Sequence, residues 1–385
     1  TVVEAAGEGA ALGEWPRSTV DDVRDAVDAL RRGSADWASR APLERCAILS
    51  SALQILGTDP DPGNCIARTL GLPPAELARR AARLPRRVGL PQVGRAGGDV
   101  AGSAPPAPSD PGGGLALVHR HWSELHEGAA GALCSELAAG RVVLLLGDPR
   151  VPALADRLAV ALVAAGVPAG ALAVLHDDAD DTLRAALISG AFERVVASGH
   201  GSDESVLARS IETLSGQSAF GRGVLDTSLP ELVFTRLECG RARVRRGDDP
   251  AQRAREVARA AFGSSQTMSG QLPGQVGVVT VDPRRLSVFT AELLVALEVE
   301  QLAEPCLPFV DRGLGALLEG QRDLGLDEGA TLIHEGLRSG SRPSGEGAKL
   351  ARLIFTNVEP RMRLLAGGRP APLLLLVREE DSTST

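Results

Sequence analysis

Two residue types are wholly or nearly missing from this 385-residue chain. It has no tyrosine, and Lys349 is its only lysine, so the positive charge comes almost entirely from arginine. A mechanism that needs a Schiff-base lysine elsewhere, a lysine ammonium on a phosphate or a tyrosine acid is therefore excluded.

The chain also lacks a surplus of basic charge, a long apolar run and a basic leader. Its 41 basic and 49 acidic residues give a net charge of −8, which makes nucleic acid and anionic membranes poor partners. Apolar stretches such as 373–377 and its flanks are far shorter than the ~20 residues that cross a bilayer. The first residues are acidic and rich in glycine and alanine. We expect a soluble, unsecreted, cytoplasmic protein.

Cysteines are few and scattered. There are five, and none forms a Cys-x-x-Cys pair. An odd number of isolated thiols predicts neither a disulfide framework nor a zinc site, so we expect no metal and a reducing cytosol.

The length and composition are those of a multidomain globular protein. With 44% hydrophobic and 23% charged residues the chain is not disordered as a whole, and at ~150 residues per domain its length predicts two or three domains. Two amphipathic helices are expected between 20 and 55 and a further helical stretch at 74–87. A Pro/Gly-rich segment, 89–114, follows.

Strand and helix patterns then alternate. Apolar segments at 115–118, 141–146, 171–175 and 194–197 predict strands, and the stretches 127–139, 152–165 and 181–188 predict helices. Apolar strands separated by helices are typical of a parallel sheet covered on both faces. We therefore predict an α/β fold, doubly wound, with a first domain over 1–231.

A second, smaller α/β domain is predicted over 232–385. Its expected strands are 232–237, 276–281, 330–333, 351–355 and 372–377, and its expected helices are 250–262 and 286–302. The arginines at 241, 243, 245 and 246 are expected on an exposed loop.

Several local strings, taken in order, resemble the aldehyde dehydrogenase superfamily. Trp37 with Glu44 and Arg45 is similar to that family's early helix pair. Further similar strings are Leu-Ala-Ala-Gly-Arg-Val-Val-Leu-Leu at 137–145, Val-Pro-Ala-Gly-Ala-Leu-Ala-Val-Leu at 167–175, Gly-Ala-Thr-Leu-Ile at 329–333 and Phe-Thr-Asn-Val-Glu-Pro-Arg-Met-Arg at 355–363. The resemblance implies a Rossmann-like nucleotide-binding domain followed by a catalytic domain. It also implies a cysteine nucleophile, an asparagine oxyanion donor, a glutamate base and an NAD(P) cofactor.

The nucleophile position of this resemblance carries no thiol. The family's Gly-Gln-x-Cys motif matches Gly270-Gln271-Leu272-Pro273, and the alternative register through Gln266 gives Met268. Proline has neither a nucleophile nor a backbone N–H, so the covalent step and one oxyanion donor are lost at Pro273.

Other family positions are altered as well. Ser123 stands where the oxyanion asparagine is expected. The string at 146–149, Leu-Gly-Asp-Pro, replaces the lysine and glutamate that hold the adenosine ribose. The string at 368–372, Gly-Arg-Pro-Ala-Pro, lacks the carboxylate that holds the nicotinamide ribose. We therefore expect no cofactor.

Two features of the family survive. Glu238, in Leu-Glu-Cys-Gly, matches the general-base position as a vestigial residue, and the neighbouring Cys239 is expected to be a small core residue. The glycine loop that would approach a pyrophosphate has two registers, one ending at Gly199 and one with Gly216 and Gly221. An ordinary turn explains these glycines equally well.

These replacements predict a catalytically inactive member of the family, a pseudoenzyme that acts as a complex subunit. The resemblance also suggests that the oligomerisation hairpin is replaced by 89–114 and that the catalytic domain is truncated. The expected partner is another protein subunit, with an active aldehyde dehydrogenase as first candidate. The alternatives are an NAD(P)-dependent aldehyde dehydrogenase and a small-molecule or nucleotide sensor.

Overall fold

The chain forms two compact units. The computed structural model describes residues 2–3, 11–88, 90, 113–176, 181–199, 207, 210–211, 230–263, 270–300, 313–335, 352–367 and 371–379. The first domain comprises chiefly 11–67 and 73–236, and the second chiefly 68–72 and 237–385. Most of the Pro/Gly-rich segment 89–114 lies outside the described residues.

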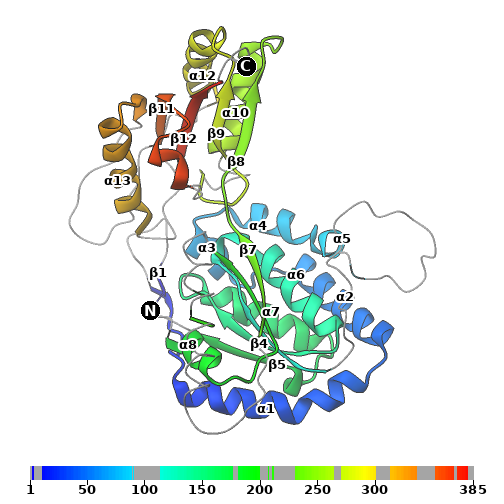
Figure 1. Ribbon diagram of the computed structural model, residues 1–385. Helices are drawn as coiled ribbons and strands as arrows, with labels where there is room; N and C mark the ends of the chain where they lie inside the picture. The colour runs from blue at the N-terminus through cyan, green and yellow to red at the C-terminus, as the bar shows by residue number, and fades with distance from the viewer. Residues whose placement is uncertain are drawn as a thin grey trace. The chain divides into compact units, whose positions relative to one another are not determined.

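The first domain contains a five-stranded parallel sheet (Figure 1). Its strands, in spatial order, are β5 (Leu172–His176), β4 (Val142–Gly147), β3 (Leu115–His119), β6 (Arg194–Gly199) and β7 (Glu231–Arg236). The chain runs outward from β3 through β4 to β5 and then returns to the other side of β3. This reversal between β3 and β6 is the point at which doubly wound sheets bind ligands.

Helices pack on this sheet. The helices of the domain are α1 (Val20–Ser39), α2 (Pro42–Thr58), α4 (Pro74–Ala81), α5 (Leu84–Arg87), α6 (Leu125–Ala138), α7 (Pro152–Ala164) and α8 (Asp181–Ile188), with 3-10 turns η1 (Trp122–Glu124) and η2 (Ala169–Ala171). Helix α3 (Cys65–Leu70) is divided between the two units after Ala67. Helix α1 contacts α8 and the sheet, whereas α2 packs on α6 and α7. A small separate pair, β1 (Val2–Val3) and β2 (Ala11–Gly13), lies near the N-terminus.

Two of the strings that carry the family resemblance meet in space. The Trp37 indole Nε1–H donates to the Leu137 carbonyl at 2.9 Å, and the buried Arg45 guanidinium donates to the Ala138 carbonyl at 3.1 Å. Carbonyls in the last turn of a helix have no partner within the helix. The motif Trp…Glu-Arg therefore serves to cap the end of α6, in the Leu-Ala-Ala-Gly string.

We expect Trp37→Phe to destabilise the protein more than Trp122→Phe does. Both indoles are buried, but Trp122 Nε1 has no hydrogen-bond partner among the described residues. Both changes remove similar apolar area, and only Trp37→Phe also removes a buried hydrogen bond, worth about 1 kcal/mol, although the Leu137 carbonyl keeps the Gly140 N–H at 3.0 Å. Urea unfolding of both variants measures the difference. Equal losses would mean that the indole hydrogen bond does not contribute.

The domain boundary falls later in the chain than the sequence predicts. The strand expected to open the second domain at 232 is β7, which pairs in parallel with β6 from Arg194↔Glu231 to Gly199↔Arg236. It therefore completes the first sheet, and the second domain begins at Leu237. The predicted assignment of this strand was wrong.

The second domain has its own five-stranded sheet. Its order is β10 (Thr331–Glu335), β11 (Leu353–Val358), β12 (Leu373–Arg378), β9 (Val276–Val281) and β8 (Gly240–Val244). All neighbours are parallel except β10, which is antiparallel to β11. Strand β8 replaces the loop expected around Arg241 and Arg243, because its backbone pairs with β9 at the edge of the sheet.

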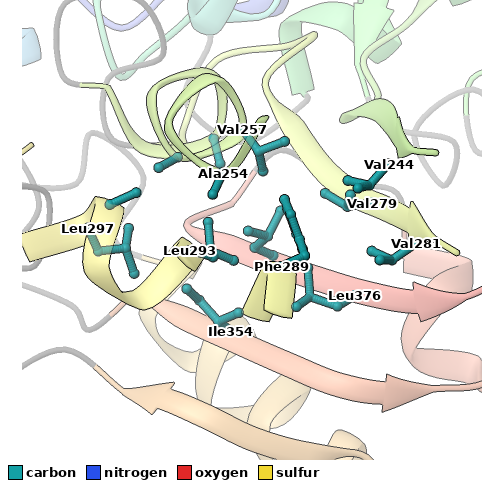
Figure 2. Close-up of a cluster of buried hydrophobic side chains, with 14 of the residues drawn as sticks. Val244, Ala254, Val257, Val279, Val281, Phe289, Leu293, Leu297, Ile354 and Leu376 are labelled. Atoms are coloured by element: carbon teal, nitrogen blue, oxygen red, sulfur yellow. The ribbon is translucent and has the colours of Figure 1, made fainter. Parts of the chain in front are cut away.

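Two apolar clusters hold helices to this sheet. Helices α10 (Pro250–Phe262) and α12 (Leu286–Val299) enclose the cluster of Figure 2, in which Val257, Phe289 and Leu293 meet Val279 and Leu376 of the strands. A second cluster packs α13 (Gly313–Asp327) and η3 (Arg363–Gly367) on the sheet, and its buried members include Leu318 and Phe355. No helix within the described ranges is both long enough and apolar enough to span a membrane.

Candidate functional site

The segment matched to the nucleophile motif is a tight turn before β9. Gly270 and Gly274 have φ values of +96° and +77°, and Pro273 lies half-buried between them. A Cβ at Gly270 would lie 2.8 Å from the Pro372 Cα, so only glycine fits there. The turn thus offers a saturated ring where the family resemblance expects a thiol. The alternative register at Gln266 and Met268 lies outside the described residues.

Glu238 lies beside this turn. The Gly274 N–H donates to the Glu238 carbonyl at 3.0 Å, and the Gly240 N–H donates to the Gln275 carbonyl at 2.5 Å. The base position and the nucleophile position, 35 residues apart in the sequence, are therefore neighbours in the fold. The Glu238 side chain is exposed.

Cys239 is the thiol closest in sequence to this turn, and it packs inward. A Cβ at Gly277 would lie 2.7 Å from its Sγ, and the side chain packs on the α13 cluster. Burial raises the pKa of the Cys239 thiol above its ordinary value, against the opposing effect of Arg241. A protonated, packed thiol is a poor nucleophile.

A third family position meets the same turn. The Gln275 amide donates to the Ala371 carbonyl at 2.9 Å, next to the Pro372 that contacts Gly270. Residues 368–370 lie outside the described part. The second domain therefore brings together the segments of Glu238, Pro273 and the end of the 368–372 string. Among the described positions matched to the family, Glu238 supplies a carboxylate and none supplies a nucleophile.

Ser123 belongs to the first domain, in the short turn after β3. It is buried, and its Oγ lies 2.7 Å from the Nδ1 of His121, whose backbone N–H donates to the Ser198 Oγ at 2.9 Å. The His121 ring caps this turn, because its Nδ1 also accepts the Ser123 N–H at 3.3 Å, and the Ser123 hydroxyl is engaged with the same ring. Gly199, one residue beyond Ser198, is buried at the end of β6 opposite Arg236. Gly216 and Gly221 lie outside the described residues.

A charged network that the sequence analysis missed closes the carboxyl ends of β3 and β6. Glu124 accepts from both Arg120 and the Ser198 hydroxyl, and Arg120 also donates to the Ala197 carbonyl at 3.2 Å and to Thr235 Oγ1 at 3.1 Å. The only signal for it in the sequence is the i, i+4 spacing of Arg120 and Glu124. The ligand-binding point of the sheet is thus bridged by the protein's own side chains.

The polar side chain at the end of β4 also has hydrogen-bond partners within the domain. Asp148 is buried, accepts the Trp122 N–H at 2.9 Å and forms a bidentate pair with Arg150 at 2.8 and 2.7 Å. Burial alone would raise the pKa of Asp148, but Arg150 outweighs burial and the pKa lies below its usual value. Leu146 is 1% exposed within the strand. Neither residue is free to hold a ribose hydroxyl.

The end of β5 is covered by the N-terminal segment. His176 Nε2 lies 3.0 Å from Asp156 Oδ1, and the Trp15 indole donates to Asp156 Oδ2 at 2.6 Å. The backbone N–H of His176 donates to the Ser18 Oγ at 3.0 Å. Many polar groups at the carboxyl ends of β3, β6, β4 and β5 therefore already have partners within the domain, although buried atoms such as His176 Nδ1 have none among the described residues.

No metal-ligand cluster accompanies these residues: within the described ranges, no three His, Cys, Asp or Glu side chains lie close enough to hold an ion. A surface hollow of about 340 Å³ lies elsewhere, between β8 and the start of α10. Its charged lining is internally paired, for example Arg253 with Glu256 at 2.8 Å and the Arg245 N–H with Asp248 at 2.8 Å.

Solved structures identify the fold. The NAD-dependent benzaldehyde dehydrogenase from Corynebacterium glutamicum matches 99% of this chain and 81% of its own, with 15% identity and a TM-score of 0.75. The NADP-dependent glyceraldehyde-3-phosphate dehydrogenase from Bacillus halodurans matches 99% and 78%, with 19% identity and a TM-score of 0.75. The gamma-glutamyl-gamma-aminobutyraldehyde dehydrogenase from Burkholderia cenocepacia matches 99% and 76%, with 19% identity and a TM-score of 0.78.

The class of protein that these matches define is the aldehyde dehydrogenase fold, with two α/β domains. The fold implied by the sequence resemblance is confirmed. No protein-family model and no curated protein matches the sequence itself.

Proposed function

We propose that this chain is a catalytically inactive subunit with an aldehyde dehydrogenase fold, which acts by binding another protein. The observation that carries the proposal is Pro273, which stands in the turn beside Glu238 where the family resemblance requires a thiolate. Covalent attack on an aldehyde needs a nucleophile such as an ionised sulfur, and proline offers only saturated carbon beside an amide nitrogen whose lone pair is delocalised into the peptide bond.

Glu238 cannot replace the lost step. The role that the resemblance gives this carboxylate is to activate water against a thioester, and no thioester forms without a thiol. Ser123 is buried and engaged with His121, so it also offers no free donor to a developing oxyanion. We infer that Glu238 is a vestige of the family's chemistry.

We further propose that the chain binds neither NAD nor NADP. The support is the set of bonds among Arg120, Glu124, Ser198, Asp148 and Arg150, because a dinucleotide would have to break contacts that already satisfy buried charges. The fold matches an aldehyde dehydrogenase over 99% of the chain, whereas the residues at the matched catalytic and cofactor-binding positions differ from the family pattern. This combination favours a role in binding. An active aldehyde dehydrogenase is the partner we propose first.

The enzymatic alternative is an NAD(P)-dependent aldehyde dehydrogenase, and it can be tested directly. Purified protein should form no NADH or NADPH from a panel of aldehydes, and neither cofactor should raise its melting temperature. An active aldehyde dehydrogenase assayed in parallel controls for the reagents. Turnover, or a cofactor-dependent rise in melting temperature, would establish the alternative.

Pro273→Cys separates the loss of the nucleophile from the loss of the cofactor contacts. We expect this variant to stay inactive, because the change restores the thiol and the backbone N–H at position 273 but neither the asparagine oxyanion donor nor the cofactor contacts. Gain of NAD-dependent oxidation by this single change would show that the cofactor site is intact.

Co-expression with an active aldehyde dehydrogenase from the same genome tests the partner: we expect a complex of defined mass, and failure to associate contradicts the subunit role.

A further inference from the structure

Helix α12 carries an apolar stripe that stays exposed among the described residues of its domain. Phe289 and Leu293 point into the core (Figure 2), whereas Val288, Val295 and Val299 are 47%, 54% and 67% exposed. Residues seven and four positions apart lie above one another on a helix. The three valines therefore form one continuous line, unlike the single exposed apolar residues that are normal on a monomer.

Opposite charges flank this stripe at its two ends. Arg284 is exposed just before the helix begins, and Glu298 is exposed in its last turn. The neighbouring charges are already engaged within the domain, since Arg285 donates to the Arg246 carbonyl at 2.9 Å and Arg259 pairs with Glu300 at 2.6 Å. Arg284 and Glu298 are thus the exposed charges beside the valines.

We propose that α12 is the contact of a symmetric homodimer, in which two copies of the chain cover each other's valines in antiparallel orientation. A two-fold axis between positions 291 and 292 sets Val288 level with Val295 of the second copy, because each residue advances both helices equally. Glu298 lies on one flank of the stripe at ~100° per residue, and the same axis brings its helical turn level with the start of the second copy's helix, which Arg284 precedes by two residues. Ala291, at the axis, is small enough for close approach.

The charge pattern is what selects a second copy as the occupant. Each helix supplies both an Arg284 and a Glu298, so the antiparallel pair forms two equivalent ion pairs, as an isologous interface requires. Glu292, on the other flank near the axis, faces its own symmetry mate. That like-charged pair opposes association, so its neutralisation should strengthen the dimer.

Sedimentation velocity over a concentration series of the full chain tests the proposal. Four small side chains cover less than the ~800 Å² per partner of a stable interface, so the mass should rise from 39.9 kDa toward twice that value only with concentration. Val295→Glu should raise the dissociation constant about tenfold or more. Val163→Glu, at an equally exposed valine of α7 (53%), is the matched control and should change nothing.

Charge reversal tests the geometry. Arg284→Glu and Glu298→Arg should each weaken the dimer, and the two changes in one chain should restore it to within about twofold, because both ion pairs are then reversed together. Glu292→Gln should tighten it. A monomer at all concentrations, a dimer indifferent to Val295→Glu, or a double reversal that fails to recover would overturn the proposal. This inference stands independently of the proposed function, since neither NADH formation nor cofactor binding enters it.

Discussion

Gly33→Ala should cost the first domain about 4 kcal/mol of stability. Gly33 lies inside α1, where it packs against the backbone of Gly170 in η2. A Cβ at this position would lie 2.3 Å from the Gly170 carbonyl oxygen and 2.5 Å from its Cα. No side chain can rotate away to relieve such a contact, so α1 or η2 would have to move away from the starts of β4 and β5.

Gly131→Ala is the matched control for this experiment. Gly131 also lies inside a helix, α6, but a Cβ there would meet nothing within 4 Å. The change should therefore stabilise the protein by about 0.5–1 kcal/mol, since alanine favours helix over glycine. Urea unfolding followed by circular dichroism compares the two variants. Similar midpoints for both would show that the α1–η2 contact yields easily.

The sequence pattern predicts the helices and buried strands of this fold well. The helix expected at 250–262 is α10 over the same residues, and the strand expected at 276–281 is β9. These segments are long or strongly apolar, so the local pattern agrees with the burial that the fold imposes. The α/β class followed from their alternation and is confirmed.

The pattern fails where a strand is short and polar. Strand β8 reads Gly-Arg-Ala-Arg-Val, a sequence that suggested an exposed loop. Its pairing with β9 supplies backbone hydrogen bonds at a sheet edge, where charged side chains remain in water. Strand β7 was identified but placed in the wrong domain, because no local signal tells a strand which distant neighbour it will pair with.

The candidate site shows the same division. The family resemblance alone identified Glu238 and Pro273, and the structure sets their segments side by side. The Glu124 network could not be predicted, because it joins Arg120, just after β3, and Glu124 of η1 to residues of β6 and β7 that are far away in the chain. These long-range bonds are also the main support for our proposal that no dinucleotide binds.

His126 should make the protein lose stability as the pH falls from about 6.5 to 4. Its ring is 2% exposed, and its Nε2 donates to the Pro60 carbonyl at 3.1 Å. Burial lowers the pKa of His126 from 6.5 to about 4. The unfolded chain therefore takes up a proton at a higher pH than the folded protein, so acid favours unfolding across this window. At about 1.4 kcal/mol per pKa unit, the loss approaches roughly 3 kcal/mol.

His126→Gln isolates this contribution, because a glutamine amide can donate to Pro60 without titrating. The free energies of urea unfolding of both proteins are measured from pH 7.5 to 4.5. Their difference should be constant above about pH 7, and below that pH the free energy of the unchanged protein should fall relative to that of the variant. Shifted carboxyl groups such as Asp148 and Asp156 act equally in both proteins and cancel in the difference. Curves that stay parallel throughout would mean that the pKa of His126 is the same in the folded and unfolded protein, and hence that water reaches its ring.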